Sequence, residues 1–178
     1  MKHFLKKAGY SLLGFLILVV IVAFLLPSES HIEVSVKIDA PVQTVFDQVN
    51  DLRNWESWSP WKTMDPLMEM SFSNPPAGKD AFLKWRSDNS KIGSGKLTLA
   101  EVIPQERVLI VMDSDQSRDH TSQMTFQEIR GKVKVTWSTD ISLGRNPLLR
   151  YNGLFRRGAM RNLFETGLQS LKKNTEPQ

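Results

Sequence analysis

Four side chains that could bind a cation lie in one polar stretch of the sequence. They are Asp113, Asp115, Asp119 and His120. Oxygen-rich spacing of this kind is typical of calcium ligands, but the stretch lacks the glycine and the terminal bidentate glutamate of a calcium-binding loop. We therefore expect residues 113–120 to form a solvated hairpin loop, and we expect no metal site.

The chain has three histidines and no cysteine, which limits the chemistry that it can support. A Ser-His-Asp hydrolase would need His31 or His120 beside a nucleophile-elbow motif, and the sequence has none. Two such histidines without cysteine do not predict a zinc site. The sequence has no phosphate-binding loop and no dinucleotide fingerprint, so we expect no cofactor.

General acid–base catalysis by a carboxylate requires no particular spacing of residues in the sequence. No catalytic residue is therefore assigned. Arg86 and Glu101 lie on predicted strands and could face a cavity, although an outward polar position is the preferred interpretation.

Tryptophan is frequent, with five residues in the chain. Trp55 and Trp58 fall near one face of a predicted short helix, and Trp61 follows Pro60 in a predicted loop. These rings could form an aromatic wall at a cavity mouth, or they could pack in the core, where large aromatics dominate the buried area. Core packing is preferred for Trp58, and both alternatives stay open for Trp61.

An apolar segment near the N-terminus precedes the predicted strands and helices of the domain. Residues 8–28 carry no charged side chain, and a helix of that length reaches about 30 Å, the thickness of a bilayer's hydrocarbon core. A signal peptide would have a shorter apolar region and a small-residue cleavage site, which Ala23–Pro27 does not offer. We expect a cytoplasmic tail over residues 1–7, one transmembrane anchor over 8–28 and one domain over 29–178.

Charge around this segment predicts its orientation. The lysines before it are Lys2, Lys6 and Lys7. Because positive residues stay on the cytoplasmic side, the domain should lie at the outer face of the cytoplasmic membrane, which is the periplasm in a Gram-negative bacterium.

Residues 145–173 near the C-terminus are strongly basic, with Glu165 as their single acidic residue. The basic residues are Arg145, Arg150, Arg156, Arg157, Arg161, Lys172 and Lys173. The segment could contact anionic lipid headgroups, although a solvated helix face is the preferred interpretation. Nucleic acid is not an expected partner, because no base-stacking motif accompanies the charge.

Apolar periodicity predicts an α+β domain. Residues 32–38 alternate as a strand with one buried face, Pro41 marks the first turn of a helix, and a short helix follows. Further strands are predicted at 68–72, 81–85, 91–102, 108–112, 121–129 and 132–142. Gly93 and Gly95 are expected to mark a bulge or a close backbone approach in the strand at 91–102. A long C-terminal helix carries an apolar stripe, and it must cover the concave face of an antiparallel sheet.

This order of elements resembles the helix-grip fold of the START/Bet v 1-like superfamily, also called SRPBCC or polyketide cyclase-like. The matching stretches are Asp39–Pro41, Trp55–Trp61, Gly93–Gly95, Tyr151–Phe155 and Phe164–Leu168. They are similar to a membrane-anchored bacterial branch, over residues 31–173. The resemblance implies a curved antiparallel sheet wrapped on the C-terminal helix, with a cavity for lipids, sterols, polyketides or other apolar molecules. It implies no shared catalytic set.

The inward face of such a fold is both core and cavity wall. The expected cavity residues are Trp58, Trp61, Met70, Phe72, Trp85, Leu97, Met124, Phe126, Trp137, Leu163 and Phe164. The leading hypothesis is a membrane-anchored binding module for a hydrophobic small molecule or lipid. The alternatives are a cyclase-, dehydratase- or hydrolase-type enzyme on an apolar substrate, and a protein-interaction module of an envelope complex.

Overall fold

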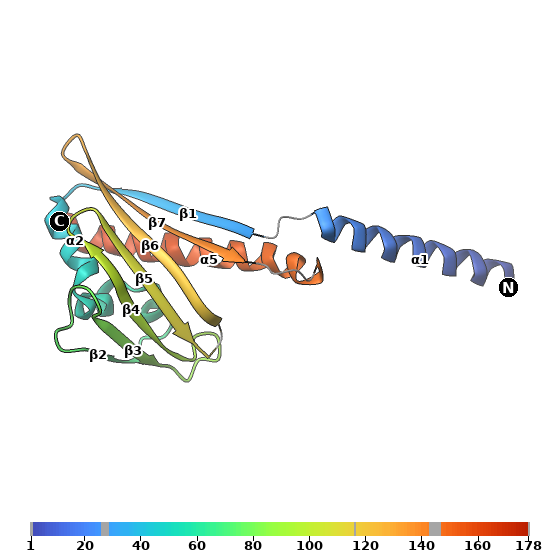
Figure 1. The fold of residues 1–178 in the computed structure, drawn as a ribbon, viewed down its shortest axis with the longest axis horizontal. Helices are drawn as coiled ribbons and strands as arrows, with labels where there is room; N and C mark the ends of the chain where they lie inside the picture. The colour runs from blue at the N-terminus through green and yellow to red at the C-terminus, as the bar shows by residue number, and fades with distance from the viewer. Residues whose placement is uncertain (1, 26–28, 116, 143–146, 178) are drawn as a thin grey trace. The chain divides into compact units, whose positions relative to one another are not determined.

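The computed structural model describes residues 2–25, 29–115, 117–142 and 147–177 (Figure 1). The chain divides into two units, Met1–Ser30 with Ile141–Ala159, and His31–Asp140 with Met160–Gln178. In the first unit, α1 covers Lys2–Leu25. We expected a membrane span over residues 8–28. Among the residues that the structure describes, no helix is long and apolar enough to cross a membrane.

Seven strands form one sheet, in the order β1-β7-β6-β5-β4-β3-β2. The strands are β1 (Glu29–Ile38), β2 (Glu69–Phe72), β3 (Phe82–Arg86), β4 (Ser94–Ile103), β5 (Arg107–Ser114), β6 (Ser117–Ile129) and β7 (Lys132–Ser142). Every pairing from β2 to β7 is antiparallel. The helices are α2 (Val42–Asn50), the 3-10 helix η1 (Leu52–Asn54), α3 (Trp55–Trp58), α4 (Pro60–Met64) and α5 (Pro147–Thr175). The predicted α+β class and its antiparallel sheet with a C-terminal helix are confirmed.

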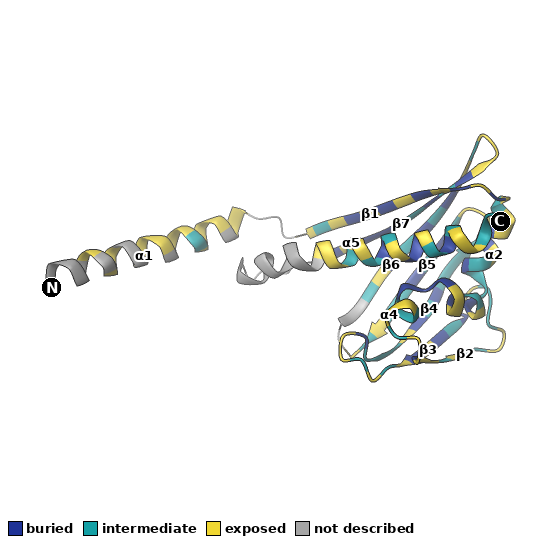
Figure 2. Cartoon of the chain, turned by 180° about the vertical axis from the view of Figure 1, so that it is seen from behind, coloured by how far each residue is buried: buried dark blue, intermediate teal, exposed yellow. Residues whose placement is uncertain are grey.

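The buried faces follow the predicted periodicities. The side chains of β1 alternate between buried and exposed, and α2 buries Val45, Phe46 and Val49 (Figure 2). In α5, Phe164, Leu168 and Leu171 are buried. An added Cβ on Gly167 would lie 3.0 Å from both Pro60 Cδ and Trp137 Cζ3. The glycine therefore lets α5 approach β7 and α4 closely.

Two local predictions were wrong. Helix α4 replaces the predicted loop after Pro60, because proline fits the first turn of a helix and forces the preceding Ser59 into an extended conformation. The stretch 113–120 is largely strand rather than loop: β5 runs to Ser114, and β6 begins at Ser117. Backbone hydrogen bonds between strands form in polar sequences as well as in apolar ones. The polar composition of residues 113–120 was therefore not sufficient reason to predict a loop.

Of the two expected meanings of the glycines near the start of β4, a bulge or a close approach, the structure shows a close approach at Gly95. The register shift against β5 lies between Leu99 and Glu101, not at the glycines. Gly93 instead ends a turn with φ of 61° and donates its N–H to Asn89 O, which delays the start of β4 from residue 91 to Ser94. Gly95 is a site of close backbone approach, as described below.

Candidate functional site

A small apolar cavity lies between β2–β5 and the short helices α3 and α4. Its volume is about 10 Å³, and it is lined by Trp55, Trp61, Met68, Met70, Leu83, Trp85, Leu97 and Met112. A cavity of this size holds about one water molecule. Side chains therefore fill most of the space that an apolar ligand would need.

The structure brings four of the expected cavity residues to this wall: Trp61, Met70, Trp85 and Leu97. Others of the expected set are buried elsewhere in the core: Trp58, Met124, Phe126, Trp137 and Phe164. Phe72 and Leu163 are half-buried on β2 and α5 and do not line the cavity.

Four of the lining residues were not among the expected cavity residues: Trp55, Met68, Leu83 and Met112. Trp55 was one of the rings considered for an aromatic wall at the cavity mouth. Strand alternation could have found two of the four. Leu83 lies two residues before Trp85 on β3, and Met68 lies two before Met70, so each pair shares a face.

Trp137 is the centre of an aromatic cluster beside the cavity. Its ring stacks on Phe164 at 4.3 Å, with an interplanar angle of 8°. The rings of Trp55 and Trp58 meet it edge-on at 6.1 Å, and that of Trp61 at 6.2 Å. Trp137 on β7 thereby joins α3, α4 and α5 in one packed group.

Hydrogen bonds fix the rings of α3. Trp55 Nε1 donates to Val49 O at 2.9 Å, and Trp58 Nε1 donates to Gln48 O at 3.0 Å. These two carbonyls belong to the last turn of α2, where backbone acceptors lack helical partners. The indole N–H groups therefore satisfy the end of α2 and set the position of the Trp55 ring at the cavity.

A glycine shapes the opposite wall. Trp85 on β3 pairs with Gly95 on β4. A Cβ built on Gly95 would overlap the Trp85 ring and would lie 2.5 Å from Asp113 O. The indole thus occupies the space that the side chain of any other residue at position 95 would fill.

An open hollow of about 550 Å³ lies next to the cavity along β2 and β3. It shares Met68, Met70 and Trp85 with the cavity wall, and its outer rim carries charged groups that include Glu56 and Lys84. The short edge strand β2 therefore lies between the cavity and solvent, and it carries few side chains.

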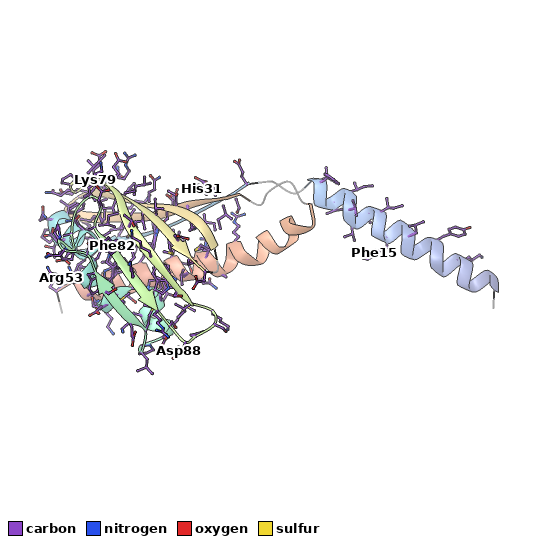
Figure 3. All side chains as sticks on the ribbon, turned by 60° about the horizontal axis from the view of Figure 1, so that its bottom comes forward. Phe15, His31, Arg53, Lys79, Phe82 and Asp88 are labelled. Atoms are coloured by element: carbon purple, nitrogen blue, oxygen red, sulfur yellow. The ribbon has the colours of Figure 1, made fainter. Side chains whose placement is uncertain are left out.

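Charged groups near the sheet face outward. Arg86 is exposed, and Glu101 accepts a hydrogen bond of 2.9 Å from Arg107. His31 is exposed on β1 (Figure 3), and its Nδ1 lies 2.7 Å from Asp140 Oδ1. The hydrogen bond to Asp140, followed by that to Glu33, raises the pKa of His31 above its ordinary value.

The polar stretch that could have bound a cation does not gather its ligands among the residues described. There, no group of three or more histidine or acidic side chains is close enough to hold a metal ion. The side chain of Asp119 lies outside the described residues.

Residues 29–176 match the family described as "Polyketide cyclase / dehydrase and lipid transport". The chain belongs to this family. The match begins after the apolar N-terminal segment and does not bear on a membrane-anchored branch. No curated protein sequence matches the chain.

Solved structures share this fold with the cyclase/dehydrase-family chain. KanY is 16% identical, with a TM-score of 0.62, over 85% of this chain and all of its own. The Aha1 dimer from Colwellia psychrerythraea is 12% identical, with a TM-score of 0.60, over 83% of this chain and 96% of its own. The di-domain ARO/CYC BexL is 17% identical, with a TM-score of 0.59, over 85% of this chain and 51% of its own. At these identities the likeness concerns the fold alone.

Proposed function

We propose that this domain binds an apolar small molecule or lipid in the cavity between the sheet and helices α3 and α4. The observation that carries the proposal is the lining, which consists of tryptophan, methionine and leucine side chains. Methionine is unbranched and flexible, so Met68 and Met70 can move to admit a ligand at modest cost. Apolar lining with aromatic walls is the usual character of a small-molecule site.

The first test asks whether a ligand enters the cavity past β2. Replacing Met70 by tryptophan fills the cavity from its mouth, and we expect the affinity for an apolar fluorescent probe, N-phenyl-1-naphthylamine, to fall about tenfold or more. The matched control is Lys96→Trp, which adds the same side chain at an exposed position on the outer face of β4. The probe should bind this control as it binds the wild type.

Native mass spectrometry of the wild type should show a co-purifying mass of lipid size. The binding proposal would be contradicted if the wild type bound no probe and carried no such mass, even after incubation with envelope lipids.

We also propose that the N-terminal segment holds the domain at the outer face of the cytoplasmic membrane. The support is the sequence alone, which is uncharged over residues 8–28 and preceded by lysines. The full chain should remain in the membrane pellet after alkaline carbonate extraction, and its C-terminus should be cleaved by protease added to spheroplasts. Release into the carbonate supernatant would contradict membrane attachment.

An enzyme acting on an apolar substrate is the second candidate, because the name of BexL describes an ARO/CYC protein in the same fold. The cavity wall favours binding over catalysis, since none of its described lining residues is titratable. An interaction module has less support. Outside α1, Met64 and Leu67 are the large hydrophobic residues that the described part of the chain exposes.

A further inference from the structure

One edge of the sheet has no strand beside it. β2 is the last strand in the sheet order and, among the described strands, pairs with β3 alone (Figure 1). Free backbone groups on such an edge can pair with another chain, and proteins usually block them with lysine, proline or a bulge. The sequence of β2 contains neither lysine nor proline, and its pairing with β3 shows no register shift. This edge is therefore open to pairing, over the few residues that its length allows.

The register shows which backbone groups of β2 are free. Ser73 N donates to Phe82 O at 2.8 Å, so these two residues face each other across the strand pair. Opposed residues of an antiparallel pair alternate between facing each other with their N–H and C=O groups and facing away. Ser71 therefore also faces β3, whereas the N–H and C=O groups of Met70 and Phe72 point away from β3. Two donors and two acceptors thus lie along the open edge.

An open hollow surrounds this edge. The hollow of about 550 Å³ along β2 and β3 is lined by Met70 and Trp85, which also line the cavity on the inner side of the sheet. It is lined as well by Ser71 and Lys84, which are exposed on the opposite side. A hollow that touches both sides of the sheet lies at its rim. The edge of β2 therefore has space beside it for an added strand, with Glu56 of α3 as a further lining residue.

Charge around the edge indicates the kind of partner. A second open hollow, of about 380 Å³, shares Glu69 and Arg86 with the first. The acidic residues that line the two hollows are Glu56, Asp65, Glu69 and Asp88. The basic lining residues Lys84 and Arg86 lie on β3, which is one strand spacing of about 4.8 Å farther from the edge. A strand added to β2 would therefore lie closest to acidic groups on its outer side.

We propose that the edge of β2 binds an extended segment of another protein, in which apolar residues alternate with lysine or arginine. The segment adds an antiparallel strand, and its residues opposite Met70 and Phe72 exchange backbone hydrogen bonds with them. Because opposed residues share a face, the apolar side chains lie on the cavity side and the basic ones lie beside Ser71 and Glu69. Leu67, which is 89% exposed two residues before β2, provides further apolar contact. This contact does not depend on what the cavity holds.

The first test uses the wild-type chain in nanodiscs of zwitterionic phosphatidylcholine and the fluorescein-labelled peptide Val-Lys-Val-Lys-Val, with binding followed by fluorescence anisotropy. N-methylation of the valines removes the donors that would face β2, so the affinity should fall about tenfold or more. The matched control is N-methylation of the lysines, whose N–H groups would face away from β2, and it should keep the affinity. The acidic peptide Val-Glu-Val-Glu-Val should bind about tenfold more weakly than the basic one.

A second test changes the edge itself. Phe72→Pro removes the outward N–H and spares the hydrogen bonds to β3, and proline is tolerated where the N–H of an edge strand faces solvent. We expect this variant to bind the basic peptide about fivefold more weakly, the effect of one net hydrogen bond. The matched control Phe72→Val keeps the N–H and should bind the peptide as the wild type does.

Several results would overturn the inference. They are no binding of the basic peptide, equal binding of the two methylated peptides, equal binding of the acidic and basic peptides, and equal binding by the two variants. Wild-type dimers that Phe72→Pro dissociates in sedimentation velocity would also overturn it, because the edge would then hold a second copy of this chain. None of these results bears on the binding of an apolar molecule in the cavity.

Discussion

A Trp137→Ala variant should lose about 3–5 kcal/mol of its free energy of unfolding, the usual cost of removing a large buried aromatic. The indole is fully buried, stacks on Phe164 at 4.3 Å and meets Trp55 and Trp58 edge-on at 6.1 Å. Because these neighbours come from separate elements, local relaxation cannot close the space that the ring leaves. Urea unfolding followed by far-ultraviolet circular dichroism measures the loss.

Trp137→Phe is the matched control for this variant. It keeps an aromatic ring against Phe164 and removes the donor to Ser122 Oγ, so it should cost distinctly less than alanine. A loss below about 1 kcal/mol in Trp137→Ala would mean that the cluster contributes little to stability, and the assignment of Trp137 as its centre would fail.

Gly95→Ala should destabilise the domain by about 1–3 kcal/mol, the range for overpacking a well-packed site. The new methyl group meets the Trp85 ring on one side and Asp113 O, 2.5 Å away, on the other. The ring can rotate away, but the carbonyl belongs to the β5 backbone and cannot. Thermal unfolding measures the cost, and the displaced Trp85 ring should also alter apolar probe binding.

Gly158→Ala controls for the loss of glycine itself. No described heavy atom lies within 4 Å of a Cβ built at this helical position. Alanine favours the helix by up to about 1 kcal/mol over glycine, so Gly158→Ala should be neutral or stabilising. If both variants had the same stability as the wild type, the close approach of Trp85 to Gly95 would not exist in the protein.

The periodic elements of the fold could be predicted because each buries one face. Residues 32–38 alternate and become β1, and Phe164, Leu168 and Leu171 recur at helical spacing and form the buried side of α5. Glycine at 95 also carried a usable signal, since close backbone approach was one of its two expected meanings.

Non-periodic features could not be predicted in the same way. Helix α4 has five residues, too few for a pattern, and its start depends on the conformation of Ser59 before Pro60. His120 looked like a loop residue because its neighbours are polar, and its strand position depends on pairing with Met112, a distant part of the chain. Which inward side chains line the cavity and which fill the core depends on curvature, which alternation does not encode.

The aromatic cluster also gives the protein an intrinsic spectroscopic signal. The Trp55 and Trp61 rings are stacked at 6.4 Å with an interplanar angle of 8°, and Trp137 stands at 73° to Trp61. Indole transitions held this close couple as excitons and give circular dichroism bands that single rings lack. Because Trp55 and Trp61 line the cavity, a ligand that parts them changes this coupling. Circular dichroism of the unlabelled chain would therefore report the binding of such a ligand.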